Sequence, residues 1–188
     1  MAALSIGTGR VAVILAHEST GSLCQWWPYA RSLAAHFRVV AFDFDGFGAS
    51  LLGDGNFPGE VAAAAEWARR HGSRQIVLMG ASMGGTAFMV AAAYLGDHVT
   101  GVIDLSGPAE FVGMDALTAA RRVHVPVLFG YGTLDIAFAG DVRRVRAATA
   151  TSDKPVVTLS EPTHGVDLVG FAMVRQAVLR FIEAITNG

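Results

Sequence analysis

The chain has 188 residues, 52% of them hydrophobic and 16% charged, and its formal net charge is −2. This composition predicts one well-buried globular domain over residues 1–188 and excludes a disordered chain. The small net charge gives no electrostatic footprint for nucleic acid or for an anionic membrane, so neither is an expected partner.

The cysteine content is typical of a reducing compartment, and the hydropathy pattern shows neither a targeting segment nor a membrane span. The one cysteine, Cys24, cannot form an intrachain disulfide. No basic segment is followed by an apolar stretch and a cleavage site, and no apolar run reaches the ~18 residues of a membrane span. The sequence therefore predicts a soluble, cytoplasmic protein, and it leaves a homodimer open.

Short apolar runs alternate with longer amphipathic ones along the chain. The predicted strands lack polar alternation, as is typical of strands covered on both faces, and comprise Val11–Ala16, Val39–Phe44, Gln75–Met79, Gly101–Leu105, Pro126–Tyr131 and Pro155–Leu159. The predicted helices are Leu23–His36, Gly59–His71, Gly84–Leu95, Met114–Arg122, Ala139–Ala150 and Val169–Thr186. These repeats predict a three-layer α/β/α sandwich around a mostly parallel six-stranded sheet.

The third predicted strand leads into the most informative motif of the chain. Gly80, Ser82 and Gly84 form a Gly-x-Ser-x-Gly turn between an apolar strand and an Ala-rich helix. A serine nucleophile at a strand-to-helix turn sits in strained backbone geometry, and glycines two residues on either side prevent side-chain clashes. The helix that follows would direct its N-terminal amides at developing negative charge. The motif therefore predicts a nucleophilic serine.

Other polar residues follow the predicted strands, where ligands of a parallel sheet bind. They are His17, Glu18, Ser19, Asp43, Asp45, Asp104, Ser106, Asp135, Glu161, Thr163 and His164. A serine hydroxyl needs a base to remove its proton, and the base needs a carboxylate to orient it. Ser82, Asp135 and His164 occur in the chain order nucleophile, acid, histidine.

Five segments carry a resemblance to a known family: Ile14–Ser19, Asp43–Ser50, Gly80–Gly84, Pro126–Asp135 and Thr163–Gly165. With these residues in this order, the sequence resembles the α/β-hydrolase superfamily over nearly its whole length. The resemblance implies Ser82 as nucleophile, His164 as base and Asp135 as acid. It also implies an oxyanion hole formed by the N–H groups of Met83 and Ser19.

The chain departs from the family pattern in three places. Glu18 stands where members carry glycine, and we expect its carboxylate either to turn outward or to contact substrate. Residues Met1 to Arg10 leave no room for the opening pair of strands. Only Ser106 to Val125 separates the fourth strand from the fifth, so we expect a minimal fold without a cap domain and with an open site.

Two assignments have competitors. His17 also lies at the carboxyl edge of the sheet, but it is close to the end of its strand, so we expect it to hold the oxyanion loop by hydrogen bonds. Asp104 competes with Asp135 as the acid, since some family members place the acid at that strand. Asp135, in a loop free to bend toward His164, is favoured.

Pocket residues are predicted from their places near the rim. Glu18, Trp26, Phe111 and Phe138 are expected to bind substrate, and Cys24 is expected to be a buried small apolar residue. The histidines lack metal-ligand spacing, so no metal and no cofactor are expected.

The sequence thus predicts a serine hydrolase of uncharged or lipophilic esters, thioesters or lactones, with a small-molecule acyl substrate and an acyl-enzyme intermediate. Two alternatives stay open. The same triad can perform acyl transfer, cyclisation or lyase chemistry in a biosynthetic pathway, and a hydrolase scaffold can serve as a non-catalytic binding protein.

Overall fold

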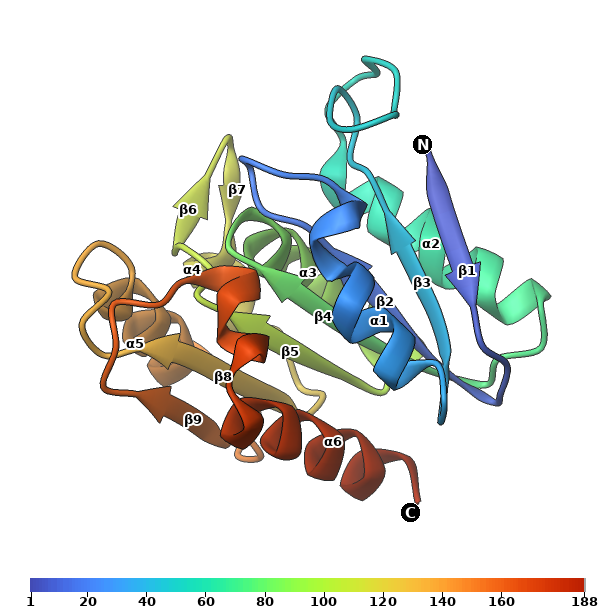
Figure 1. The fold of residues 1–188 in the computed structure, drawn as a ribbon. Coiled ribbons are helices and arrows are strands. Elements are labelled where there is room, and N and C mark those ends of the chain that lie inside the picture. The colour runs from blue at the N-terminus through green and yellow to red at the C-terminus, as the bar shows by residue number, and fades with distance from the viewer. Residues whose placement is uncertain (188) are drawn as a thin grey trace.

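A computed structural model describes residues 1–187. Its centre is a seven-stranded sheet with the order β1-β3-β2-β4-β5-β8-β9, in which only β1 runs antiparallel to its neighbour (Figure 1). The strands are β1 (Ala3–Ile6), β2 (Val11–Ala16), β3 (Arg38–Phe42), β4 (Gln75–Ala81), β5 (Gly101–Leu105), β8 (Val127–Gly132) and β9 (Val156–Leu159).

The six predicted strands are confirmed, but the predicted total of six is wrong, because the segment Met1 to Arg10, which holds no opening pair of strands, does hold one strand. Residues Ala3–Ile6 pair antiparallel with Val39–Phe42 of β3. Four residues suffice here because an edge strand needs only one partner, and its outer side chains remain exposed. The sheet therefore has one of the two opening strands that the family pattern would provide.

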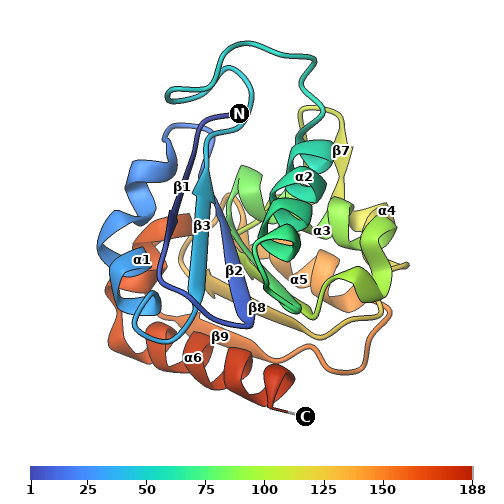
Figure 2. The ribbon, with the colours of Figure 1, turned by 90° about the vertical axis from the view of Figure 1, so that its right-hand side faces the viewer.

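Helices cover both faces of the sheet and make the predicted three layers (Figure 2). On one face lie α1 (Trp27–Leu33) and α6 (Ala172–Thr186), and on the other lie α2 (Phe57–Arg70), α3 (Met83–Leu95), α4 (Ala116–Ala120) and α5 (Ala139–Ala148). Each face has its own cluster of buried apolar side chains. No helix within residues 1–187 combines the length and the apolar character that crossing a bilayer requires.

Several predicted helices are shorter or divided. The first consists of the 3-10 helix η1 (Leu23–Trp26) and α1, with Pro28 at the start of α1, where the missing N–H costs nothing. Asp115 accepts a hydrogen bond from the Thr118 N–H and caps α4. The segment before α4 forms a hairpin of β6 (Glu110–Phe111) and β7 (Met114–Asp115), which the sequence analysis did not predict.

The loops that follow the parallel strands leave the sheet at one edge, at the upper left of Figure 1. They comprise residues 17–22, 43–56, 106–115, 133–138 and 160–164. After the last of these, the 3-10 helix η3 (Gly165–Gly170) crosses back and packs against β4 and β5. This return brings the chain after β9 to the end of β4, across two intervening strands.

Candidate active site

Ser82 stands between β4 and α3 in a backbone conformation that few residues adopt. Its φ is 50° and its ψ is −118°. A Cβ on Gly80 would collide with the backbone of Gly84 and Gly85, and a Cβ on Gly84 would collide with Ala16 of β2. The predicted turn and the reason for its glycines are therefore confirmed.

The elbow is fixed by its neighbours on both sides. The Ser82 N–H donates to the Leu105 carbonyl at 2.8 Å, and the Ser82 carbonyl accepts from the Thr86 N–H at 3.1 Å. The Ser82 residue is 7% exposed, and the first turn of α3 after it is buried. Such a strained backbone persists only where the surrounding structure holds it. Here β4, α3 and the neighbouring strand β5 together hold the strained backbone of Ser82.

His164 and Asp135 come together from the loops after β9 and β8. His164 Nδ1 lies 2.6 Å from Asp135 Oδ2. A carboxylate has no proton to give at neutral pH, so Nδ1 carries the hydrogen and Nε2 keeps a free lone pair. The imidazole is therefore held in the tautomer that a general base needs.

A glycine at the end of β8 lets the two loops approach each other. A Cβ on Gly132 would collide with the backbone of Glu161 and Thr163, so the chain that leads to His164 passes directly over it. The Thr133 N–H also donates to the Leu159 carbonyl at 2.7 Å. Gly132 lies within a segment that carries the resemblance, but no motif in the sequence marks it for this role.

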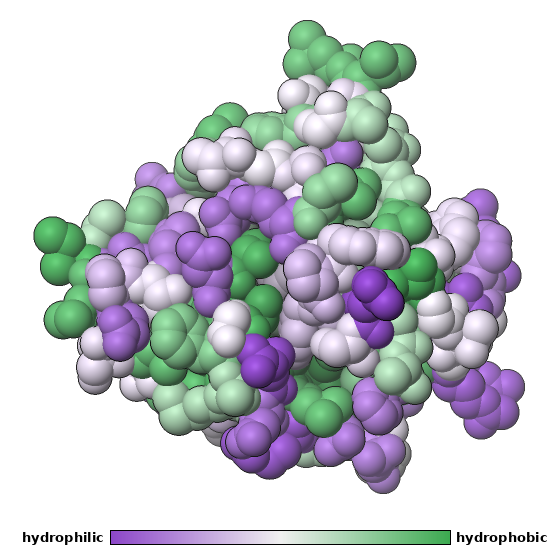
Figure 3. Space-filling view, in the orientation of Figure 1, coloured by the Kyte–Doolittle hydropathy of each residue, from purple (hydrophilic) through white to green (hydrophobic). Residues whose placement is uncertain are grey.

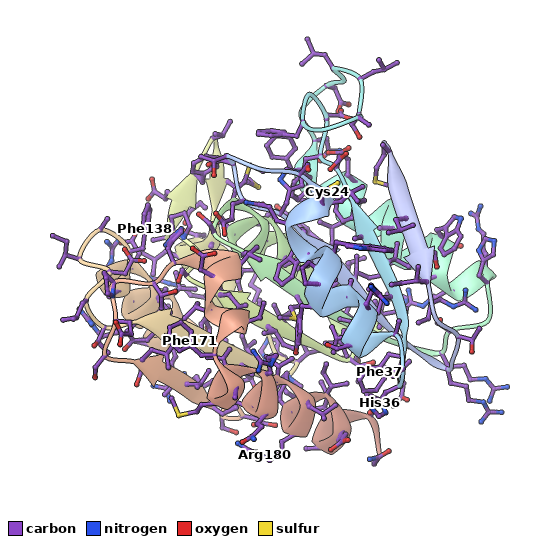
Figure 4. The ribbon with its side chains drawn as sticks, in the orientation of Figure 1. Cys24, His36, Phe37, Phe138, Phe171 and Arg180 are labelled. Carbon is purple, nitrogen blue, oxygen red and sulfur yellow. The ribbon has the colours of Figure 1, made fainter. Side chains whose placement is uncertain are left out.

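The aromatic ring of Phe138 packs against His164. The ring centroids are 4.5 Å apart, and Phe138 lies on the segment that leads into α5 (Figure 4). Both side chains are partly buried. Phe138 thus restricts the imidazole from one side while Asp135 orients it from another.

His17 is bound through both ring nitrogens. Its Nδ1 lies 2.6 Å from the Glu18 carbonyl, and its Nε2 accepts the Phe44 N–H at 3.1 Å. The carbonyl can only accept, so Nδ1 carries the proton and no lone pair is left for substrate. Burial lowers the pKa of His17 and keeps the ring neutral. The expectation that His17 holds its loop is confirmed.

Asp104, the competing acid, faces a different part of the molecule. It is fully buried, and its Oδ1 accepts the Gly107 N–H at 2.9 Å. A Cβ on Gly85 of α3 would collide with this carboxylate. Burial raises the pKa of Asp104 to about 7. His164 is therefore hydrogen-bonded to Asp135, whereas Asp104 lies beneath the elbow.

The two predicted oxyanion donors lie on backbone that other contacts fix. Met83 is the first residue of α3, and Ser19 follows His17 and Glu18 in the loop after β2. Within residues 1–187, neither N–H donates to a backbone acceptor. No three His, Cys, Asp or Glu side chains of this part of the chain are grouped so as to hold a metal ion.

A family model described as "alpha/beta hydrolase fold" matches residues 11–130. The chain belongs to the α/β-hydrolase fold family. No protein of curated function matches the sequence. Solved structures that resemble this α/β-hydrolase over almost its full length give the same fold.

A monoacylglycerol lipase from Paleococcus ferrophilus is 18% identical with a TM-score of 0.83, over 98% of this chain and 99% of that one. An enol-lactonase from Burkholderia xenovorans LB400 is 16% identical with a TM-score of 0.77, over 100% of this chain and 96% of that one. Est1E from Butyrivibrio proteoclasticus, solved with ferulic acid bound, is 18% identical with a TM-score of 0.76, over 96% and 95%.

Two predictions about the rim of this α/β-hydrolase are wrong. Trp26 does not line an accessible pocket: it is fully buried and packs with Val13 and Leu15 in the core beneath α1. Cys24 is exposed, at the start of η1 (Figure 4). Residues two positions apart lie on different sides of any such helical turn, so only one of the two can face the core, and the larger apolar side chain takes that position.

The other two predicted pocket residues, Phe111 and Glu18, lie in different parts of the molecule. Phe111 is partly buried in the hairpin β6–β7 and packs against the core below α3. The Glu18 carboxylate does not turn outward. Its Oε1 accepts the Val166 N–H at 2.6 Å, a contact across the site that the sequence analysis did not foresee.

Proposed function

We propose that this α/β-hydrolase is a serine hydrolase that cleaves uncharged or lipophilic esters, thioesters or lactones through an acyl-enzyme. The observation that carries the proposal is the 2.6 Å hydrogen bond between His164 Nδ1 and Asp135 Oδ2, because it leaves Nε2 free to act as a base. His164 is the one of the two edge histidines whose ring retains this lone pair.

In the proposed reaction, Ser82 Oγ attacks the substrate carbonyl as His164 Nε2 takes its proton. The N–H groups of Met83 and Ser19 stabilise the oxyanion, and the positive end of the α3 dipole adds to this. His164 then returns the proton to the leaving alcohol or thiol. Water, deprotonated by the same nitrogen, hydrolyses the acyl-enzyme and restores Ser82. Asp135 stabilises the imidazolium in both halves.

The charge distribution supports an uncharged substrate. The loops 17–22, 43–56, 106–115, 133–138 and 160–164 contain no Lys or Arg, although Glu18, Asp45, Glu110 and Glu161 lie on them. An anionic acyl group would therefore approach a negative edge without a cationic partner. Competition between neutral and carboxylate-bearing esters of equal chain length measures this preference directly.

Exposed apolar side chains on the loops at this edge of the sheet support a lipophilic substrate. Leu51 and Leu52 are highly exposed at the tip of the loop between β3 and α2, where Figure 3 shows hydrophobic surface. Leu134 and Ile136, next to Asp135, are also exposed. No long insertion separates β5 from β8 to cover these loops, since only the β6–β7 hairpin and α4 lie there.

Active-site labelling with a fluorophosphonate tests the nucleophile. The native protein should be labelled on Ser82, and Ser82→Ala should lose both labelling and ester hydrolysis. Ser106→Ala is the matched control, because Ser106 is also buried at a strand end with a positive φ of 59°. Undiminished labelling of Ser82→Ala, or loss of labelling only in Ser106→Ala, would contradict the assignment.

A further inference from the structure

Glu18 connects two loops that are far apart in the sequence. Its carboxylate oxygen Oε1 lies 2.6 Å from the backbone nitrogen of Val166, 148 positions further along the chain. A charged acceptor at this distance makes one of the stronger kinds of protein hydrogen bond. The loop that carries Ser19 is thereby tied to the loop that carries His164.

The carboxylate also lies against the backbone of Gly165. Gly165 has a positive φ of 51°, and a Cβ at this residue would collide with Glu18 Oε1 and Cδ. The turn after His164 therefore needs glycine twice, once for its backbone conformation and once for the carboxylate. This close fit leaves the turn little freedom to move relative to Glu18.

Glu18 is itself held in place. Its carbonyl accepts the Gly21 N–H at 3.1 Å and a hydrogen bond from His17 Nδ1 at 2.6 Å. Its N–H lies 3.4 Å from Gln25 Oε1. His17 is in turn bound to the Phe44 N–H. The carboxylate thus extends from a loop whose backbone is anchored to η1 and, through His17, to the segment that follows β3.

We infer that Glu18 is a positioning residue: its carboxylate holds the turn His164–Val166 against the oxyanion loop and so fixes the base relative to the oxyanion donors. The inference rests on the proposed function of Ser82 and His164. It also explains how a carboxylate is tolerated next to an oxyanion site, because its hydrogen bond with the Val166 N–H holds it at the histidine loop. Misplacement of a catalytic group by about 1 Å can lower a rate by about 10²-fold.

Three variants separate the possible roles. Glu18→Gln keeps an oxygen that can accept the Val166 N–H but removes the charge. Glu18→Ala removes both. Glu161→Ala is the matched control, because Glu161 is an exposed carboxylate in the same loop as His164 and makes no side-chain hydrogen bond within residues 1–187.

Fluorophosphonate labelling rates and ester hydrolysis are measured at 25 °C, with melting temperatures recorded in parallel. Glu18→Ala should lower the labelling rate and kcat by about 10–10²-fold with little change in KM. Glu18→Gln should recover most of the loss, and Glu161→Ala should behave as the native protein. Native labelling rates in Glu18→Ala would overturn the inference. So would equal losses in Glu18→Gln and Glu18→Ala, which would assign the effect to charge.

Amide hydrogen exchange at Val166 provides a readout that does not depend on catalysis. Exchange at this position should accelerate in Glu18→Ala and stay slow in Glu18→Gln and Glu161→Ala. If native protein carries no label on Ser82 while exchange follows this pattern, the proposed function fails and the contact stands. If labelling is specific to Ser82 while exchange at Val166 is the same in all variants, the inference about Glu18 fails alone.

Discussion

The serine side and the histidine side of the site are built in different ways. Ser82 lies within one continuous segment, β4 to α3, and its conformation is imposed by Gly80, Gly84 and the adjoining strands. His164 and Asp135 lie on two partly exposed loops, and one short hydrogen bond joins their side chains. The proposed nucleophile is thus positioned by local backbone geometry and the proposed base by tertiary contacts. Substitutions on the histidine side should therefore change activity more than stability.

The largest change in activity is expected when the proposed base on the histidine side is replaced. His164→Ala should lower the rate of acylation by about 10⁴–10⁶-fold, because no other group can take the Ser82 proton. The partly exposed imidazole contributes little to the core, so the melting temperature should change little. Single-turnover measurements on an activated ester follow acylation directly.

His17→Ala is the contrasting variant. It removes a buried ring that holds Glu18 and Phe44, so it should lower the melting temperature clearly and acylation far less than His164→Ala does. Full acylation activity in His164→Ala, with loss only in His17→Ala, would reverse the assignment of the base.

The next effect concerns the acid. Asp135→Asn should keep the fold but lower turnover by up to about 10⁴-fold, because an amide no longer stabilises the imidazolium and can favour the wrong tautomer. Asp104→Asn should leave turnover nearly unchanged, since Asp104 is bound to the Gly107 N–H beneath the elbow. Steady-state kinetics of both variants show which of the two aspartates orients His164. A damaging Asp104→Asn beside a silent Asp135→Asn would place the acid on β5.

The smallest effect is a pH-dependent stability on the serine side. Burial raises the pKa of Asp104 to about 7 in the folded protein, above the ~3.9 of an unfolded aspartate. Its contribution to stability is therefore fully present below about pH 4 and is lost as the pH rises through about 7. Asp104→Asn removes this penalty and keeps an acceptor for Gly107.

Melting temperatures at pH 5 and pH 8 measure the difference. The melting temperature of Asp104→Asn minus that of the native protein should be larger at pH 8 than at pH 5, by about 3 °C or more. Burial also raises the pKa of Glu60 to about 7, so only the difference between the two proteins isolates Asp104. A difference that does not grow with pH would show that the charge of Asp104 is not destabilising.

The sequence alone predicted most of what local patterning determines. The Gly-x-Ser-x-Gly turn and the six parallel strands follow from residues that are neighbours in the chain, and both are confirmed. The antiparallel strand Ala3–Ile6 was missed because four residues at a sheet edge have no distinctive period. Trp26 and Cys24 were exchanged between core and surface because they lie on different sides of one helical turn, and no local pattern marks which side meets the sheet.

The contact of Glu18 could not be foreseen for a different reason. Its partner is a backbone N–H, which every residue except proline carries, so no side-chain pattern marks Val166. The pairing depends on the path of η3 back across β5 and β4. Only the assembled sheet brings those two loops together.

The direction of β1 determines where attachments to this protein would stand. Because β1 runs against its neighbours, the amino end emerges at the edge where the parallel strands finish, whereas α6 carries the carboxyl end to the opposite side (Figure 1). The Ala2 N–H donates to Ser50 Oγ at 2.7 Å, and the Ala2 carbonyl accepts from the Asp43 N–H at 2.9 Å. An affinity tag or solid support at the amino end would stand at the same edge of the sheet as the proposed site, whereas one at the carboxyl end would stand away from it.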